Sequence, residues 1–156
     1  MWGALGILAL LAIGGGTAVI LDRRQIANAL RRAFEAQGLP GAWGEAVGIV
    51  ESGLRMNARN LTGPDGARGG AWGPTQITER TARGYGYTGP MEALTTDLGL
   101  AADLSAEIAA AGRPQSIEDL GAWWNAGHAH ASDRSLPAST RDVYIPRLVA
   151  ALEGIA

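Results

Sequence analysis

The sequence contains no cysteine and no lysine, and it carries few charges of either sign. Without cysteine the chain can form no disulfide framework, no thiolate zinc site and no thiol nucleophile. Its 13 basic residues are all arginine, the formal net charge is −2 and the pI is about 5.6. This balance provides no basic field for a polyanion, so we expect no nucleic-acid partner.

Charged residues make up only 18% of the sequence and hydrophobic residues 47%, against a charged fraction of roughly 25% in average soluble domains. This composition excludes a fully disordered chain. A length of 156 residues suffices for one compact domain and little more.

The N-terminus is an uncharged run of twenty residues from Trp2 to Leu21. As a helix it reaches roughly 30 Å, the thickness of the hydrocarbon core of a bilayer. Met1 is followed by no charge, and no clean cleavage site precedes Asp22, so a cleaved signal peptide is disfavoured. The run therefore predicts an uncleaved membrane helix through residues 2–21, with a signal peptide or a buried core helix as alternatives.

The glycines of this segment and the arginines that follow it bear on its association and its orientation in the membrane. Its small residues allow close helix–helix approach in lipid, so self-association is an open prospect. The positive-inside rule would keep the following flank cytoplasmic, because that flank carries four arginines. A periplasmic domain would then need another delivery route, or a segment that can leave the membrane. The four residues are Arg23, Arg24, Arg31 and Arg32.

The rest of the chain is predicted to be all-α, because no segment shows convincing period-two alternation. Apolar residues at helical spacing, ended by glycine and proline, define the expected helices. Pro146 should kink the last of them. Residues 57–73 are too rich in glycine for a regular element and should form a long loop. The expected helices span residues 22–37, 42–52, 74–83, 91–111, 116–125 and 139–152.

Glu51 is the first candidate for chemistry, at the end of the otherwise apolar helix over residues 42–52. A helix C-terminus carries partial negative charge, and an apolar wall favours a neutral carboxyl. A general acid working near neutral pH needs that protonated form. The alternative is an ordinary solvated residue at a helix end.

Several short motifs occur in an order that resembles the soluble lytic transglycosylase domain family, over residues 42–150. That family typically has Glu-Ser-Gly, then Gly-Ala-x-Gly-Leu-Met-Gln-Ile followed by Thr-Ala, then Ala-Tyr-Asn-Ala-Gly, and a closing Thr…Tyr-Val-Pro. The matching segments here are Glu51-Ser52-Gly53, Gly70 to Ile77, Thr81-Ala82, Trp124 to Gly127, and Thr140 with Tyr144-Ile145-Pro146.

Two departures from the family pattern affect the expected sugar contacts. Pro74-Thr75 stand where the family has Leu-Met, which removes an apolar side chain that contacts sugar. Trp123-Trp124 stand where the family has Ala-Tyr, which enlarges the aromatic surface. Both changes bear on saccharide preference more than on the chemistry.

The resemblance implies a lysozyme-like all-α domain that cleaves the β-1,4 bond between N-acetylmuramic acid and N-acetylglucosamine in peptidoglycan. Glu51 would protonate the glycosidic oxygen and then take the proton of the muramic C6 hydroxyl, which gives a 1,6-anhydro product. Tyr144 would hydrogen-bond Glu51, and the remaining residues would act on the substrate. Ser52 and Gln76 would bind or orient near the cleavage site, Asn125 would position the glycan strand, and Trp72, Trp123 and Trp124 would stack on sugars or pack in the core.

Other candidates rank lower. Asp65 would be a second carboxylate if the enzyme were a hydrolytic lysozyme, and Glu79 is weaker still. His128 and His130 make a poor metal site without cysteine or clustered carboxylates. The glycine-rich loop lacks the ending of a phosphate-binding loop, so we expect no nucleotide. We also expect no other cofactor and no metal.

The expected organisation is a membrane or signal-anchor helix at 1–21, an amphipathic connecting helix at 22–39 and a lytic-transglycosylase-like domain at 40–156. Small size and a weak anchor fit a phage lysis enzyme, or a virion-carried protein that penetrates the wall and assembles with virion proteins. The domain would then be anchored in the inner membrane and reach the periplasm, or travel in the virion. The alternatives are a hydrolytic lysozyme on the same fold and a non-catalytic virion protein that binds peptidoglycan.

Overall fold

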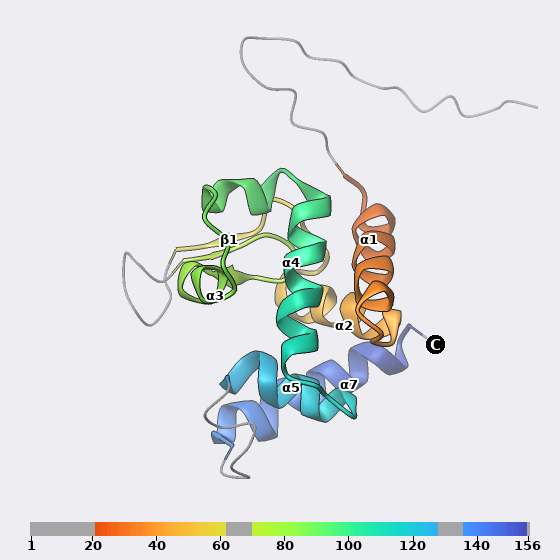
Figure 1. Ribbon diagram of the computed structural model, residues 1–156. Coiled ribbons are helices and arrows are strands. Elements are labelled where there is room, and N and C mark those ends of the chain that lie inside the picture. Colours follow the sequence, from red (N-terminus) through yellow and green to blue (C-terminus); the bar gives the residue numbers. More distant parts are fainter. Residues whose placement is uncertain (1–20, 62–69, 128–135, 156) are drawn as a thin grey trace, which may run out of the picture.

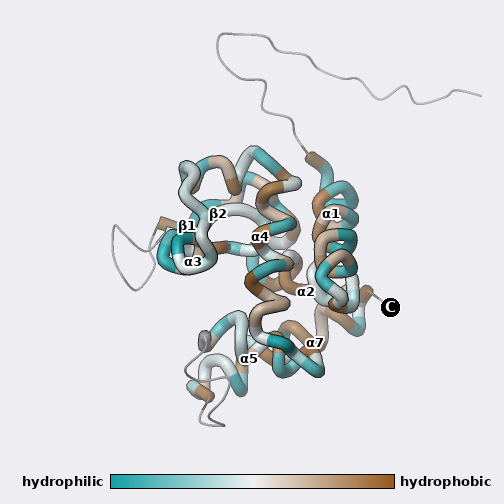
Figure 2. Tube along the Cα trace, viewed as in Figure 1, coloured by the Kyte–Doolittle hydropathy of each residue, from teal (hydrophilic) through white to brown (hydrophobic). Residues whose placement is uncertain are grey.

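The first helix, α1 (Arg23–Ala36), forms where the apolar stripe predicts it. The computed structural model describes residues 21–61, 70–127 and 136–155. Asp22 caps the helix, because its carboxylate accepts from the Gln25 amide at 2.8 Å while the Gln25 side chain accepts from the Asp22 amide at 2.9 Å. Hydrophobic and hydrophilic residues alternate along α1 in Figure 2, and its apolar face is buried in the core. The predicted membrane helix falls on residues 2–21, which lie outside the described residues apart from Leu21.

The second helix, α2 (Gly41–Ser52), packs closely against α1 through glycine. A Cβ added at Gly44 would lie 2.6 Å from the Phe34 ring and 2.8 Å from the carbonyl oxygen of Leu30. At Gly48 it would lie 2.7 Å from the Leu30 side chain. An ion pair between Arg31 and Glu45 joins the same two helices. The helix that will present Glu51 is therefore seated directly on α1.

The expected helix over residues 91–111 is two elements, so that prediction was wrong in its first part. A 3₁₀ helix, η2 (Met91–Thr95), is followed by α4 (Leu98–Ala111). The break occurs because Asp97 turns its carboxylate onto the Leu100 amide at 3.0 Å and so starts a new helix. The next helix, α5 (Ile117–Ala126), matches the expected helix over residues 116–125, and the Ser116 hydroxyl caps it by accepting from the Asp119 amide at 3.1 Å.

A small antiparallel sheet occupies part of the expected loop. Its strands are β1 (Arg59–Asn60), β2 (Ala71–Trp72) and β3 (Ile77–Thr78), with Trp72 paired to both Arg59 and Ile77. The predicted helix over residues 74–83 is wrong at its start, since α3 (Glu79–Gly84) begins only after β3. The chain turns instead at residues 73–76, where a Cβ on Gly73 would lie 2.4 Å from the Leu94 carbonyl oxygen.

The last predicted helix contains the defect that Pro146 imposes. Its first turn is a π-helix, η3 (Thr140–Tyr144), and α7 (Ile145–Glu153) continues from it with the proline in its first turn. Proline has no N–H and crowds the carbonyl one turn back, so it disfavours regular α-helix before it. A π-turn re-aims the residues that it carries.

Figure 1 shows how these elements surround α4. The sheet and α3 lie on one side of α4, α1 lies on the other, and α5 and α7 lie at its C-terminal end. The described chain is mostly helical, which confirms the all-α expectation apart from the small sheet. In the described ranges no helix has the length and apolar content needed to cross a bilayer.

Replacing Gly44 by alanine is expected to lower the free energy of unfolding by roughly 1–3 kcal/mol, because the new methyl group meets Phe34 and the Leu30 carbonyl. Gly99→Ala is the matched control, since a Cβ there meets only Asp97 at an ordinary 3.5 Å. The control should be neutral, or more stable by up to about 1 kcal/mol. Urea unfolding of both variants measures the difference, and equal effects would contradict the close α1–α2 packing.

Candidate active site

The candidate site is built around a hydrogen bond between Glu51 and Tyr144. Glu51 lies in the last turn of α2, and Tyr144 is the last residue of the π-turn. The Tyr144 hydroxyl donates to Oε1 of Glu51 at 2.6 Å, across 93 residues of sequence. The tyrosine is only 7% exposed, so this contact is held by the core. The predicted pairing of these two residues is present in the structure.

Burial raises the pKa of Glu51 above its ordinary value of 4.5. Hydrogen bonds from Tyr144 and Trp124 and the positive charge of Arg147 favour the ionised form, but loss of solvation is the larger effect. Burial and the negative charge of Glu51 also raise the pKa of Tyr144 well above its ordinary value, so its hydroxyl stays protonated and donates. The carboxyl is thus biased towards the protonated form that a general acid uses.

The same π-turn also holds Asn125 at the end of α5. The Thr140 hydroxyl, which is 1% exposed, donates to Oδ1 of Asn125 at 2.7 Å. The Asn125 side chain itself is exposed, and its amide nitrogen is the group left to donate to a ligand. Asn125 is therefore fixed at the end of α5 with its amide nitrogen exposed, and its role in positioning a substrate stays a prediction.

Ser52 and Gln76 are both tied to the turn at residues 73–76. The buried Ser52 hydroxyl donates to the Pro74 carbonyl at 2.7 Å and accepts from the Arg55 amide at 3.0 Å. The Gln76 side chain donates to the Gly73 carbonyl at 2.9 Å, and Gln76 itself adopts φ 54°. These contacts orient the turn beside the acid, so orientation is the role that the geometry gives both residues.

The Pro74-Thr75 departure is absorbed by the core. Thr75 is fully buried, and its hydroxyl shares a 2.7 Å hydrogen bond with that of Ser105 on α4. The Ser105 hydroxyl in turn donates to the Ala101 carbonyl at 2.5 Å. The hydrogen bond between Thr75 and Ser105 therefore holds the turn against α4. Pro74 and Thr75 are both buried and present no side chain to the surface.

The three tryptophans expected to stack on sugars have different environments. Trp72 is 8% exposed, with the Arg59 guanidinium 5.6 Å from its ring centre, so the core-packing alternative holds for it. Trp123 donates its indole N–H to the Ile108 carbonyl at 2.7 Å and is half-buried. Trp124 is half-buried and contacts Glu51. Only the last two offer surface beside the site.

Trp123 and Trp124 line a cleft of about 530 Å³ between α3 and α5. Trp124 connects this cleft to the acid, because the same side chain interacts with the Glu51 carboxyl and favours its ionised form. Arg147 is a further residue near the acid, through its charge and a 3.4 Å bond to the Val50 carbonyl. The cleft is lined by Arg80, Thr81, Gly84, Tyr85, Ile108, Trp123, Trp124 and Gly127.

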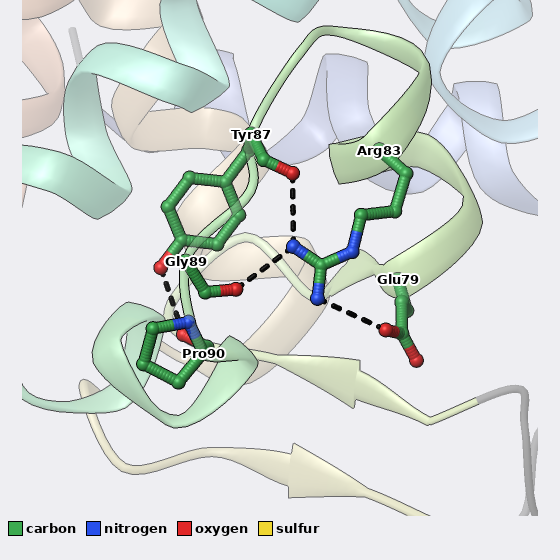
Figure 3. A network of polar contacts seen from close by, with 5 residues as sticks. All are labelled: Glu79, Arg83, Tyr87, Gly89 and Pro90. Carbon is green, nitrogen blue, oxygen red and sulfur yellow. Dashed lines mark hydrogen bonds and ion pairs between the residues drawn. The ribbon is translucent and has the colours of Figure 1, made fainter.

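The loop that carries Tyr85 into the cleft is held by a polar network around Arg83 (Figure 3). The Arg83 guanidinium donates to the carbonyls of Tyr87 and Gly89 at 2.9 and 2.8 Å, and to Glu79 at 3.0 Å. Glu79 is thereby given a structural role. The Tyr87 hydroxyl closes the network on the Pro90 carbonyl at 2.7 Å. This wall of the cleft is therefore preorganised.

Sequence reasoning did not find Arg80, Tyr85 or Arg147, because none of them stands in one of the family motifs. Asp65, His128 and His130 lie outside the described residues. No group of side chains suited to a metal ion is present in residues 21–61, 70–127 and 136–155.

The arrangement provides one proton-donating carboxyl beside an aromatic cleft, together with an exposed amide and a protonated tyrosine. Such a set can protonate a leaving oxygen and, once ionised, accept a proton from a neighbouring hydroxyl. Comparisons of the chain with protein-family models, with curated proteins and with solved structures found no match.

Replacing Glu51 by glutamine is expected to change the pH dependence of stability. Because the native pKa is raised, the folded chain holds a proton that the unfolded chain releases above about pH 4.5, so wild-type stability falls as pH rises towards the native pKa. Glutamine cannot ionise, so the unfolding free energy of the variant relative to wild type should increase between about pH 4 and pH 7. Urea unfolding at both pH values measures it.

The exposed Glu153→Gln is the matched control and should show no such increase. A difference between wild type and Glu51→Gln that stays flat, or that falls with pH, would mean that Glu51 is not destabilised as a carboxylate.

Proposed function

We propose that this chain is a lytic transglycosylase with a lysozyme-like domain, which cleaves the β-1,4 bond between N-acetylmuramic acid and N-acetylglucosamine in peptidoglycan. The observation that carries the proposal is the partly buried Tyr144–Glu51 hydrogen bond at 2.6 Å, on a carboxyl with a raised pKa. The ordered motifs that resemble the soluble lytic transglycosylase family support it. The nearby exposed Asn125 and the tryptophan-lined cleft give the glycan strand a surface to bind.

In the proposed reaction, Glu51 acts twice on the same sugar. Its protonated carboxyl gives the proton to the glycosidic oxygen, and the bond between that oxygen and C1 of the muramic residue breaks. The ionised carboxyl then takes the proton of the C6 hydroxyl while O6 forms a bond to C1. The products are a 1,6-anhydromuramic end and a free 4-hydroxyl on the departing sugar. The carboxyl returns to its protonated form, and no water is consumed.

One carboxyl suffices for this route, whereas most glycosidases require two. The electrostatic partner of Glu51 is the cation of Arg147, which would stabilise the ionised intermediate form of the acid. Tyr144 would hold the carboxyl in place through both half-reactions. We place the activity in phage lysis or in virion entry through the wall, with residues 2–21 as the membrane segment.

Glu51→Gln is expected to lower the release of soluble fragments from purified peptidoglycan by about 10²–10⁴-fold, because the general acid is lost. The full-length chain in a neutral detergent serves for the assay, and Glu153→Gln should retain wild-type activity. Mass analysis of the fragments should identify 1,6-anhydro ends. Free reducing ends would show a hydrolytic lysozyme instead, and equal activity before and after the change would exclude Glu51 as the acid.

Tyr144→Phe tests the tyrosine separately. Removing a hydrogen bond that favours the ionised carboxyl raises the pKa of Glu51 further, so the alkaline limb of kcat/KM should move to higher pH. The acid also loses its orientation, so the maximal rate should fall roughly tenfold to a hundredfold. A rate loss with an unmoved limb would indicate that Tyr144 acts only in packing.

A further inference from the structure

The cleft beside the acid has one charged side chain among its described lining residues, Arg80. Arg80 is exposed, and within the described part of the chain no hydrogen bond or ion pair engages its guanidinium. Ligand sites are typically concave and largely apolar or aromatic, with a few polar groups that fix the orientation of the ligand. The question is which ligand group would match Arg80.

The neighbours of Arg80 on α3 explain why it is left unpaired. Glu79, the adjacent acid, is held by Arg83 at 3.0 Å, and Arg83 is held by the loop of Figure 3. Gly84, one turn further on from Arg80, also lines the cleft and has nothing within 4 Å of a Cβ added to it. The cleft is therefore open at Gly84, and the only acid of α3, Glu79, is already paired with Arg83.

The lining is otherwise largely aromatic, with Trp123 and Trp124 from α5 and Tyr85 from the residue that follows α3. Burial, and then the negative charge of Glu107, raise the pKa of Tyr85; Glu107 is not among the lining residues of the cleft. An anion in the cleft would therefore be repelled from the Tyr85 edge and attracted to Arg80. A planar guanidinium matches a carboxylate, and aromatic rings match the apolar face of a sugar.

We propose that Arg80 makes this cleft a binding site for a carboxylate carried by the muramyl residues of the glycan strand, and so determines specificity. This inference rests on the proposed function. Two groups of the strand can supply this carboxylate. In peptide-free strands it is the lactyl group itself, and in peptide-bearing strands it belongs to the stem peptide. Trp124 links the site to Glu51, so a bound carboxylate fixes which sugar ring lies beside the acid.

The test measures affinity by calorimetry on the full-length chain in a neutral detergent, with Glu51→Gln throughout so that the ligand is not consumed. The probes are a neutral N-acetylglucosamine tetramer, peptide-free glycan fragments and peptide-bearing glycan fragments. Adding Arg80→Gln should weaken binding of a carboxylated ligand about five- to tenfold, since the group is exposed, and leave the neutral tetramer unchanged. The carboxylated ligand that loses affinity identifies the source.

Arg32→Gln is the matched control, because Arg32 is an exposed arginine on α1, outside the cleft lining. It should change none of the affinities. Equal loss on all three ligands, no loss on any of them, or no binding of either carboxylated ligand would overturn the role of Arg80.

Wall cleavage by the chain with Glu51 intact separates this inference from the proposed function. If the chain cleaves the wall but Arg80→Gln does not selectively weaken binding of a carboxylated ligand, only the specificity role of Arg80 is overturned. If Arg80→Gln selectively weakens binding of a carboxylated ligand but the chain cleaves no wall, the enzymatic proposal is overturned. The carboxylate site then belongs to a protein that binds peptidoglycan without cleaving it.

Discussion

The hydrogen bond between Tyr144 and Glu51 is the contact on which the candidate site depends, because it joins two segments 93 residues apart at a partly buried carboxyl. It requires the π-turn that Pro146 favours, since that turn determines where Tyr144 points. The same turn supplies Thr140 to Asn125. One irregular turn of helix therefore sets the relative positions of the acid, its hydrogen-bond donor and the exposed amide.

A second set of contacts holds the opposite side of the site. Ser52 follows Glu51 directly, yet its hydroxyl is buried against the Pro74 carbonyl. Thr75 continues the connection to Ser105 on α4. Adjacent residues at the end of α2 thus have different duties: one carries the ionisable group, and the next fixes the helix end to the turn. Losing the Ser52 or Thr75 hydrogen bond would therefore shift the position of Glu51, although neither hydrogen bond involves the Glu51 side chain.

The sequence predicted the regular helices well where their signals were local. Asp22 and Ser116 marked helix starts correctly, since each cap is made by its own side chain within one turn. The failures came where tertiary contacts prevail. The two-residue strands are too short for any periodicity, and the turn after Gly73 depends on close approach to Leu94. Pro74, the first residue of the expected helix over residues 74–83, therefore lies in this turn, and α3 begins only at Glu79.

The site was predictable only in part, for the same reason. Glu51, Tyr144 and Asn125 could be named from motif order, but a motif does not indicate which way a side chain faces. Trp72 turned out to be core, and the motifs give no sign of Arg80 or Arg147, whose importance comes only from what lies near them in space. Burial and missing partners become visible only in three dimensions.

The central claim is that burial raises the pKa of the Glu51 carboxyl. Carboxyl ¹³C NMR of the full-length chain, with the Glu51 resonance assigned by its loss in a variant, measures its titration directly. The midpoint should lie above the ordinary value of 4.5, because desolvation outweighs the donors around it. A midpoint at or below 4.5 would show a solvated or strongly stabilised carboxylate, and the site would then hold no general acid suited to neutral pH.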